Sequence, residues 1–485
     1  MILSSFLFLA ICTAIYVVWE RNFNQLYNQS TWDFHEKILA QFGNIVRLQC
    51  ISGDSLLYVA DSRALHNILV KDQYTFEEAS TFIESHFEIL SLGEHHRKQR
   101  KLLNPVFSAK HMRSLTPVFY KVTDKFRRAL TSKIGAAGGK QEVDVMVWMS
   151  RIALKLIGQG ALGYSFDNIG EEGANEYGKA AKAMMYVRAP VPSLLIRPYM
   201  PALFVTIVPR QLLPWVSDLG SASFWEKAVR ALPSKPVRAL VDIVDIMDHT
   251  SREILERKEA LQKGDAEVSQ EVGEGKDIIS VITLIIAAMD TTSAALSCIL
   301  YLLSQNIDVQ DKLRAELTRA REESRSPIGE MDYSQLARKD VMLPLGTLIT
   351  GDNGQPISEV FIPCNTDVIC SIIGVNHNPA IWGPDATTWR LERWLEPLPP
   401  SVSDVRVPGV YSNMMTFAGG ARACIGFKFS ELEMKVVLAM LLPLVKFAPS
   451  GKRVVWNIGT VSTPRLPGTN TPTMPLVLSL IDAEN

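Results

Sequence analysis

Apolar residues recur at helical spacing over most of the chain, and short apolar runs of the strand type lie near its two ends. The helical spacing is clearest over residues 116–134, 145–166, 278–306 and 308–324. The strand-like runs cover residues 44–51, 55–60, 453–458 and 474–480. Turns rich in proline and glycine separate these runs. The pattern predicts a mainly α-helical fold with small β-sheets, in the α+β class.

The amino terminus carries an apolar run of a different kind. Residues 2–19 contain no charged side chain, and a helix needs roughly 20 apolar residues to cross the bilayer core. A cleaved signal peptide is the alternative, but no basic residue precedes the run, which is also longer than the usual signal-peptide core. The pattern therefore predicts an uncleaved membrane anchor over residues 1–20. Arg21 follows it and favours a cytosolic position for the body, residues 21–485.

Two segments inside the body break the helical pattern. Residues 257–277 are rich in charged side chains and glycine, and they are predicted to form an exposed linker. Residues 189–236 contain recurring prolines among apolar residues, so they cannot form one long helix. No internal repeat or long low-complexity tract marks a further module, and the body is predicted to be one domain.

Composition narrows the function only slightly. Charged residues make up 21% of the 485-residue chain and the formal net charge is −1, so nothing global indicates a nucleic acid or another polyanionic partner. The six cysteines are scattered and lack the spacing of a zinc site. A reducing compartment fits this cysteine usage best.

One cysteine lies in an unusual setting, the sequence FAGGARACIG at residues 417–426. A lone cysteine is ordinarily a small buried apolar residue, although it can also be a disulfide half, a nucleophile or a metal ligand. The glycines of this stretch free the backbone to turn tightly, and the helix that begins near Gly426 would direct its positive end at a thiolate. Arg422 adds a cation suited to a carboxylate. Because the stretch holds no base for a nucleophile, a metal-bound thiolate is the better interpretation of Cys424, and a cysteine hydrolase is a poor one.

The same stretch resembles the haem-binding signature of the cytochrome P-450 family, FxxGxRxCxG, and Glu433 fits the usual continuation of that signature. The resemblance implies that Cys424 is the axial thiolate ligand of the iron of haem b. In this family the arginine contacts a haem propionate and the phenylalanine shields the sulfur. The residues assigned to cofactor binding here are Phe417, Gly420, Arg422 and Gly426. A thiolate ligand donates electron density to iron and favours cleavage of the O–O bond.

The apolar helix predicted over residues 278–306 carries AAMDTT at 287–292, which is similar to the oxygen-activating motif AGxDT of the family. The resemblance implies that Asp290 and Thr291 are catalytic residues that relay protons during oxygen activation. A threonine here can donate its hydroxyl hydrogen to the carbonyl of Ala287, four residues back, and bend the helix. The alternatives are a buried core helix whose acid is a local cap, or a second membrane span. Ala288 replaces the usual glycine of the motif, and its methyl group would narrow the groove at the bend of this helix.

A basic run, HHRKQRK at residues 95–101, is the third match. By itself such a run is ordinarily a solvated helix face. The family carries WxxxR at this place, and the resemblance implies that His96 and Arg100 bind haem, with His96 replacing the usual tryptophan. Their four-residue spacing puts both on one helical face. The neighbouring Arg97, Lys98 and Lys101 would contribute to a basic surface that docks an acidic redox partner.

One expected element of the family has no match. Arg393, in WGPDATTWRLERWLEP, resembles the arginine of the meander region, which a Glu-x-x-Arg helix holds in other members. Residues 333–345 run directly from the preceding loop into a strand and leave no place for that helix. The strings at 316–319 and 322–325 have the right letters but lie in a polar, charge-rich helix, so they are interpreted as coincidence. Arg393 is therefore expected to lack its partners. If the arginine is buried, that loss would destabilise the fold by about 3–5 kcal/mol.

At two further places the chain also runs directly from one family segment into the next: residues 19–30, where a proline-rich hinge is usual, and residues 276–286.

The resemblance implies a membrane-anchored haem-thiolate monooxygenase that inserts one atom of dioxygen into a small apolar substrate. Its electrons would come from NADPH through a reductase, with cytochrome b5 as a further partner, and no nucleic acid is expected. The endoplasmic reticulum membrane, with the body in the cytosol, is the expected location. The alternatives are a non-catalytic or decayed relative of the same fold, or a mis-spliced version of an active enzyme.

Overall fold

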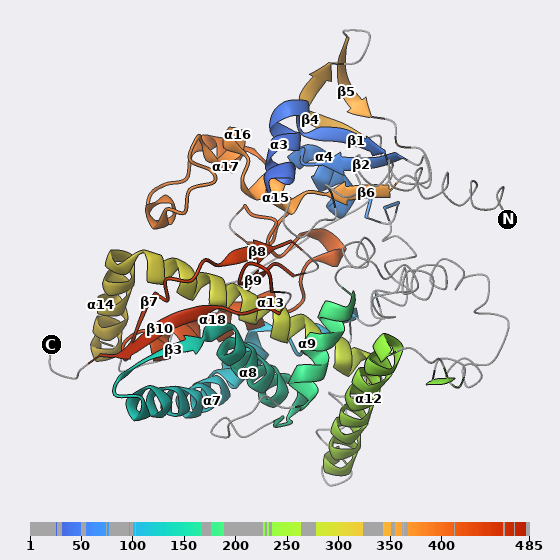
Figure 1. Ribbon diagram of the computed structural model, residues 1–485. Helices are drawn as coiled ribbons and strands as arrows, with labels where there is room; N and C mark the ends of the chain where they lie inside the picture. The colour runs from blue at the N-terminus through green and yellow to red at the C-terminus, as the bar shows by residue number, and fades with distance from the viewer. Residues whose placement is uncertain are drawn as a thin grey trace, which may run out of the picture. The chain divides into compact units, whose positions relative to one another are not determined.

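The computed structural model describes most of the body of the chain (Figure 1). The described ranges are residues 32–49, 55–73, 103–166, 176–188, 235–262, 278–323, 343–350, 355–360, 367–411, 413–458, 461–469 and 471–481, with isolated positions at 26, 75, 76, 97, 100, 101, 227, 230, 231 and 362. The chain forms two compact units. The first comprises Met1–His86, Leu90–Glu94 and Asp332–Ile425, and the second comprises Phe87–Ile89, His95–Met331 and Gly426–Asn485.

The first unit contains a three-stranded sheet. Its strands are β1 (Ile45–Gln49), β2 (Ser55–Val59) and β6 (Asp367–Cys370), with β2 in the centre, antiparallel to β1 and parallel to β6. A second, two-stranded sheet joins β4 (Leu343–Thr350) to β5 (Pro356–Val360). The helices of this unit are short: α3 (Trp32–Phe42), α4 (Ser62–His66), α15 (Ile372–Asn376), α16 (Pro379–Trp382) and α17 (Pro400–Asp404). Single turns, η2 (Asn67–Lys71), η5 (Leu391–Trp394) and η6 (Gly420–Arg422), complete it.

A buried polar contact ties the helices of the first unit to its sheet. The hydroxyl of Tyr58, on β2, lies 2.9 Å from Nδ1 of His35 and accepts a 2.8 Å hydrogen bond from Ser371. Ser371 is also the N-cap of α15, where its Oγ accepts from the Gly374 amide. Because Tyr58 is only 2% exposed, its hydroxyl needs such partners to enter the core at low cost.

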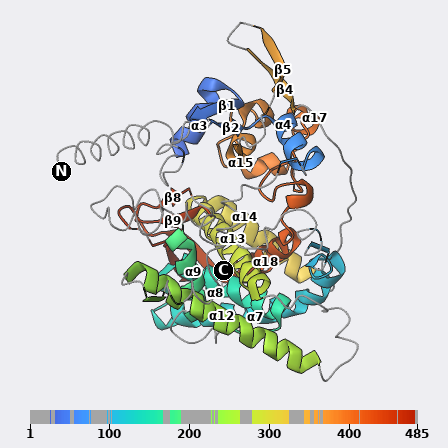
Figure 2. The same ribbon diagram turned by 90° about the vertical axis from the view of Figure 1, so that its right-hand side faces the viewer.

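The second unit is a helical body around a three-stranded antiparallel sheet. Its helices are α7 (Ala109–Ala136), α8 (Val145–Ile157), α9 (Glu176–Arg188), α12 (Lys235–Gln262), α13 (Ile278–Gln305), α14 (Ile307–Glu323) and α18 (Phe427–Leu441), with the turn η4 (Gly158–Leu162) after α8. The sheet has the order β3 (Lys140–Asp144), β10 (Pro475–Leu480), β7 (Val445–Pro449), and β8 (Val455–Asn457) pairs with β9 (Thr463–Arg465). Figure 2 shows α12 beside α9, with which it packs.

The apolar helix α13 is the centre of this unit. It packs on α8, α12, β7 and α18, and its buried residues include Ile285, Leu296 and Leu300. By length and composition, Val145–Leu162 and Leu284–Gln305 could each cross a membrane, but more than half of each is buried within the protein. That burial is typical of core helices, so the core-helix alternative describes α13 better than a membrane span.

The helices and strands predicted within the described residues are present, but some of their boundaries differ from the prediction. The helix predicted from residue 116 begins at Ala109, because Ser108 caps it and Pro117 is accommodated inside it. The helix predicted to reach residue 166 ends at Leu162, since Gly163 takes a left-handed conformation. Helix α12 continues to Gln262, so it includes the first six residues of the predicted linker. The rest of the linker and the predicted anchor at residues 1–20 lie outside the described residues.

Candidate functional site

The loop that carries Cys424 is closed by its own backbone. The Cys424 amide donates to the Phe417 carbonyl at 2.8 Å, and the Ala423 amide donates to the Gly420 carbonyl at 3.1 Å around the η6 turn. The structure thereby brings Phe417, Gly420, Arg422 and Cys424 together in one compact turn. The Cys424 side chain is exposed, although cysteine is among the residue types most often buried. A ligand sulfur requires this combination of a fixed backbone and an accessible side chain.

The glycines of the loop are there because neighbouring backbone approaches them. Gly420 has a φ of +71°, and a Cβ at this position would overlap the Leu69 carbonyl oxygen on η2. A Cβ on Gly419 would lie 2.5 Å from the Pro408 carbonyl oxygen. The Ala421 amide donates to Oε1 of Gln73 at 2.7 Å, which fixes the loop against the end of η2. Only glycine fits such close approaches.

The remaining signature residues differ in how tightly the structure holds them. Gly426 is the N-cap of α18, and the only described residue that a Cβ there would meet is Phe107, at 3.8 Å, so contacts within the described residues do not require a glycine. The Phe417 ring makes an edge contact with Tyr411, with centroids 6.2 Å apart. Arg422 is partly exposed. Among the described residues, no group of three or more His, Cys, Asp or Glu side chains could hold a metal ion.

Asp290 and Thr291 occupy adjacent positions on α13, in the second unit. The Thr291 hydroxyl donates to the Ala287 carbonyl at 2.6 Å, as the sequence predicted, and its side chain is exposed. Asp290 is 1% exposed, and its Oδ1 atom has no hydrogen-bond partner within the described structure. Burial raises the pKa of Asp290 to about 6, against the opposing charge of Lys182. A carboxyl with this pKa can both accept and donate a proton near neutral pH.

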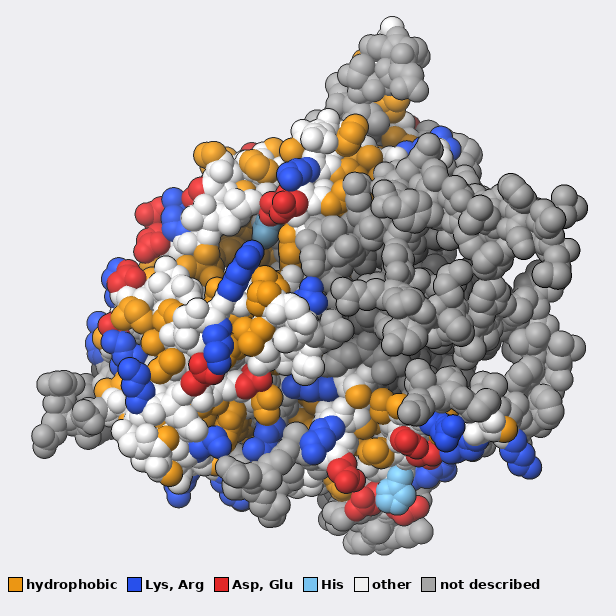
Figure 3. All heavy atoms as spheres, viewed as in Figure 1, with side chains coloured by type: hydrophobic (Ala, Val, Ile, Leu, Met, Phe, Trp, Pro, Cys, Tyr) orange, Lys and Arg blue, Asp and Glu red, His pale blue; other side chains and the backbone are white. Residues whose placement is uncertain are grey.

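Arg100 is helical and half-buried, and Arg97 and Lys101 are exposed. His96 and Lys98 lie outside the described residues, so the predicted pairing of His96 with Arg100 stays a prediction. Figure 3 shows basic and acidic side chains interspersed over the described part of one face, in keeping with a net charge near zero.

Arg393 was expected to lack partners, and the structure shows that this expectation is wrong. Its Nη1 donates to the Trp382 carbonyl at 2.8 Å and to Oδ1 of Asp385 at 3.2 Å, while its Nη2 donates to the Asp385 carbonyl at 2.8 Å. The arginine is 9% exposed and is therefore neutralised by a carboxylate of its own loop. Glu316 and Arg319 are exposed on α14, which agrees with their interpretation as a coincidental match.

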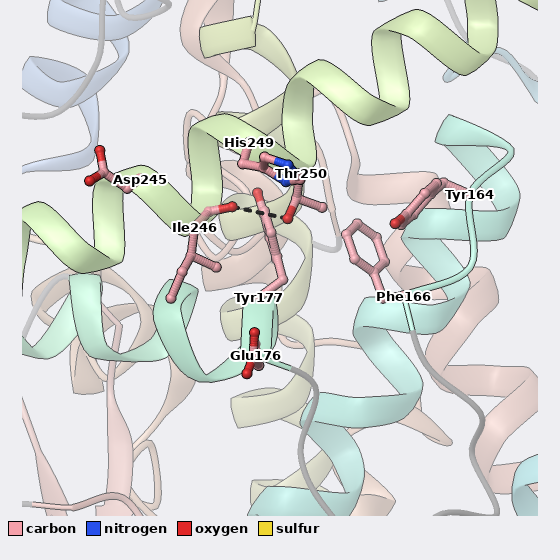
Figure 4. Close-up of a pocket in the computed structure, with 8 residues that line it drawn as sticks. All are labelled: Tyr164, Phe166, Glu176, Tyr177, Asp245, Ile246, His249 and Thr250. Carbon is pink, nitrogen blue, oxygen red and sulfur yellow. Dashed lines mark hydrogen bonds between the residues drawn. The ribbon is translucent and has the colours of Figure 1, made fainter.

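Sequence reasoning named Glu433 only as part of the cysteine signature, and it missed both the burial of that carboxyl and a pocket in the second unit. Glu433, on α18, is fully buried, neither carboxyl oxygen has a hydrogen-bond partner in the described structure, and burial raises its pKa well above the ordinary value. A pocket of about 460 Å³ lies between α9, α12 and the segment after η4 (Figure 4). Its lining residues are Tyr164, Phe166, Glu176, Tyr177, Asp245, Ile246, His249 and Thr250. None of them belongs to a predicted motif, and no periodicity or spacing in the sequence marks them.

A cysteine thiolate is one of the side chains that bind haem iron in proteins, and Cys424 lies on a tight glycine loop ahead of a helix, as the resemblance to a haem-thiolate protein implies. A sequence profile of the family described as cytochrome P-450 matches residues 14–467. Cytochrome P-450 monooxygenase 91 of Postia placenta is 39% identical, with 95% of this chain and 91% of that protein covered. Monooxygenase 212 of the same fungus is also 39% identical, with 94% and 91% covered. The ganoderic acid synthetase of Ganoderma lucidum is 37% identical, with 88% and 85% covered.

The chain belongs to the cytochrome P-450 family, whose members are haem-thiolate monooxygenases. The alignment with monooxygenase 91 extends over 512 positions, whereas 95% of 485 residues is about 461 residues. About 50 positions of that relative, inside the matched region, therefore have no counterpart in this chain. About 50 missing positions agree with the sequence interpretation that family segments are absent at residues 19–30, 276–286 and 333–345.

Proposed function

We propose that the protein is a membrane-anchored monooxygenase that uses haem b to insert one atom of dioxygen into a small apolar substrate. The observation that carries this proposal is the Cys424 loop, in which two backbone hydrogen bonds fix an exposed thiol just ahead of α18. The residues present fit the group. A single sulfur donor suits an iron whose other ligands come from a porphyrin, and Arg422 in the same turn suits a propionate.

The roles of the chain's own residues follow from their chemistry. Cys424 would bind the iron through its thiolate. The residues that would hold the rest of the cofactor are Arg422, Phe417, Gly420, Gly426, Arg100 and His96. When bound, haem supplies the activation of dioxygen, which the thiolate ligand favours. Asp290 would take up protons from solvent and pass them on, because its pKa is about 6. Thr291 would place its hydroxyl in the relay, with Ala287 holding it in position.

Electrons would come from NADPH through a separate reductase, and cytochrome b5 is a further partner. The uncharged run at residues 2–19 supports attachment to a membrane, and the endoplasmic reticulum, with the body in the cytosol, is the proposed location. The exposed Arg97 and Lys101 would contribute to docking of an acidic redox partner.

A second candidate, a relative that has kept the fold without catalysis, is favoured by one observation. The chain lacks about 50 positions that monooxygenase 91 has within the matched region, and the sequence of residues 333–345 contains no Glu-x-x-Arg string. The Asp385–Arg393 pair weighs against this candidate, because the meander arginine is satisfied without that helix.

The visible spectrum of the reduced, carbon-monoxide-bound protein separates the two candidates. A thiolate-type band supports the monooxygenase, whereas protein that stays colourless after hemin supplementation supports the second candidate. Cys424→Ala should abolish the band. Cys370→Ala is the matched control, because burial raises the pKa of its thiol to about 11 and disfavours ligation, so its band should persist. If Cys424→Ala keeps an unchanged spectrum, the ligand assignment is wrong.

A further inference from the structure

The pocket between α9, α12 and the segment after η4 has an aromatic floor. The Phe166 ring lies between the rings of Tyr164 and Tyr177, with centroids 4.9 Å and 5.0 Å away (Figure 4). Phe166 and Tyr177 are 7% and 2% exposed and belong to an apolar core cluster, so packing fixes their positions. The volume of about 460 Å³ is typical of a small-molecule site. The floor therefore suits a ligand with a flat apolar body.

The hydroxyl groups that line the pocket already use their hydrogens within the protein. The Tyr164 hydroxyl donates to Oε2 of Glu253 at 3.2 Å. The Thr250 hydroxyl donates to the Ile246 carbonyl at 2.9 Å, as the dashed line in Figure 4 marks. Toward a ligand, these two hydroxyl oxygens can therefore act only as hydrogen-bond acceptors. The ligand that matches them carries hydrogen-bond donors.

The charges around the pocket favour a positively charged ligand. Two carboxylates, Glu176 and Asp245, are among the described lining residues, which include no lysine or arginine. Both oxygens of Asp245 accept from Arg230, at 2.6 Å and 2.8 Å, so an arginine balances this charge. Glu176, the first residue of α9, is exposed and forms no ion pair or hydrogen bond with another described residue. Its negative charge would attract a cation and repel an anion.

We propose that this pocket binds an organic cation, in which a protonated nitrogen group donates to Glu176 and an attached aromatic ring packs on Tyr164 and Phe166. A planar cation with several N–H groups fits a carboxylate best, because it can donate two parallel hydrogen bonds. The aromatic floor favours both the ring and the positive charge of such a ligand. No lining residue is assigned to haem binding or to oxygen activation, so the site is additional to the proposed function.

Three probes of nearly equal size and shape test the proposal: benzamidinium, which is a cation, benzamide, which is neutral, and benzoate, which is an anion. Their dissociation constants for the full chain are measured by ligand-detected NMR at low ionic strength and pH 8, where histidine side chains are neutral. Benzamidinium should bind about fivefold more tightly than benzamide, and benzoate should bind most weakly. The protonated amidine has no basic lone pair for iron, so bound haem does not compete for it.

Paired variants locate the cation. Glu176→Gln should weaken benzamidinium by about fivefold and leave benzamide unchanged. Glu256→Gln removes an exposed carboxylate of α12 that does not line the pocket, and it should change neither affinity. Tyr164→Leu removes a ring of the floor and should weaken both probes, whereas Tyr164→Phe keeps the ring and should retain them. If Tyr164→Leu does not fold, the comparison of Glu176→Gln with Glu256→Gln decides, since both glutamates are exposed.

Two results would overturn the proposal. Equal affinities for benzamidinium and benzamide would show that the pocket does not select a cation. Equal effects of Glu176→Gln and Glu256→Gln, including no effect of either, would show that Glu176 is not the partner of the cation. The haem spectrum fails independently of this test: a missing thiolate band would remove the proposed monooxygenase function and leave the pocket to be judged by its own titrations.

Discussion

Nη2 of Arg393 lies 3.1 Å from Oδ2 of Asp385, so a half-buried carboxylate eight residues away neutralises an almost fully buried arginine. The same guanidinium donates to two carbonyl groups of its own loop. A loop that was expected to need a separate helix thus satisfies its arginine internally. The pair explains how residues 382–396 can keep their fold in a chain that is shorter than its relatives.

Asp385→Asn should therefore destabilise the first unit. The amide cannot neutralise the guanidinium, and a hydrogen bond to a charged group contributes about 1.5–3 kcal/mol. The free energy of unfolding, from urea titration, should fall by about 2 kcal/mol. Asp404→Asn changes an exposed carboxylate in the same unit and should have little effect. Equal stability of both variants would mean that Asp385 does not support the loop.

Gly420→Ala should disrupt the Cys424 loop. An added Cβ collides with the Leu69 carbonyl, and the φ of +71° costs a further 1–2 kcal/mol or so for any residue with a Cβ. Gly468→Ala isolates the second contribution, because Gly468 has a similar φ of +79° but open space around it. Haem retention and the unfolding midpoint should decrease much more in Gly420→Ala. Similar losses in the two variants would rule out the steric explanation.

Thr291→Ala should separate electron consumption from product formation. Without the hydroxyl that donates to Ala287, proton delivery becomes disordered, and general acid–base groups of this kind contribute about 100-fold or more to rate. The measurement is product and hydrogen peroxide formed per NADPH oxidised, in the presence of a substrate found by its shift of the haem spectrum. Thr291→Ser should recover much of the coupling. Unchanged coupling in Thr291→Ala would argue against a proton relay.

Glu433 and Glu431, two residues apart on α18, should have opposite effects on the pH dependence of stability. Burial raises the pKa of Glu433 in the folded state. The contribution of Glu433 to the free energy of unfolding is therefore complete below the unfolded-state pKa, and it is lost as pH rises toward the folded-state pKa. Glu431 is different: burial opposes ionisation, but Lys435 and Lys428 outweigh it and lower its pKa. Its stabilisation is present above the unfolded-state pKa and is lost as pH falls.

Urea unfolding at pH 4 and pH 7 measures both effects. Glu433→Gln should be more stable than the wild type at pH 7 and nearly equal to it at pH 4. Glu431→Gln should be less stable than the wild type at pH 7, by a small amount since its ion pairs are partly exposed. A loss of stability at pH 7 in Glu433→Gln would show that the buried carboxyl has a stabilising partner.

Local patterns predicted the regular elements well because those patterns cause them. The apolar spacing of α13 and α14, and the strand-like runs of β1, β2, β8 and β10, are properties of consecutive residues. Short elements escaped this reasoning. For example, β3 and β7 are strands because β10 pairs with both, and residues far apart in sequence supply that pairing.

The sequence by itself determined the family, the cysteine loop and the helix that carries Asp290 and Thr291, since these depend on residue types at fixed short spacings. Only the tertiary structure decided that Arg393 is satisfied by Asp385, that Gly420 is required by the Leu69 carbonyl, and that the Glu433 side chain is buried. Desolvation and close approach arise between segments that folding brings together. Spacing along one element cannot encode them: Leu69 and Gly420 are distant in sequence, and Asp385 meets Arg393 only when their loop folds back on itself.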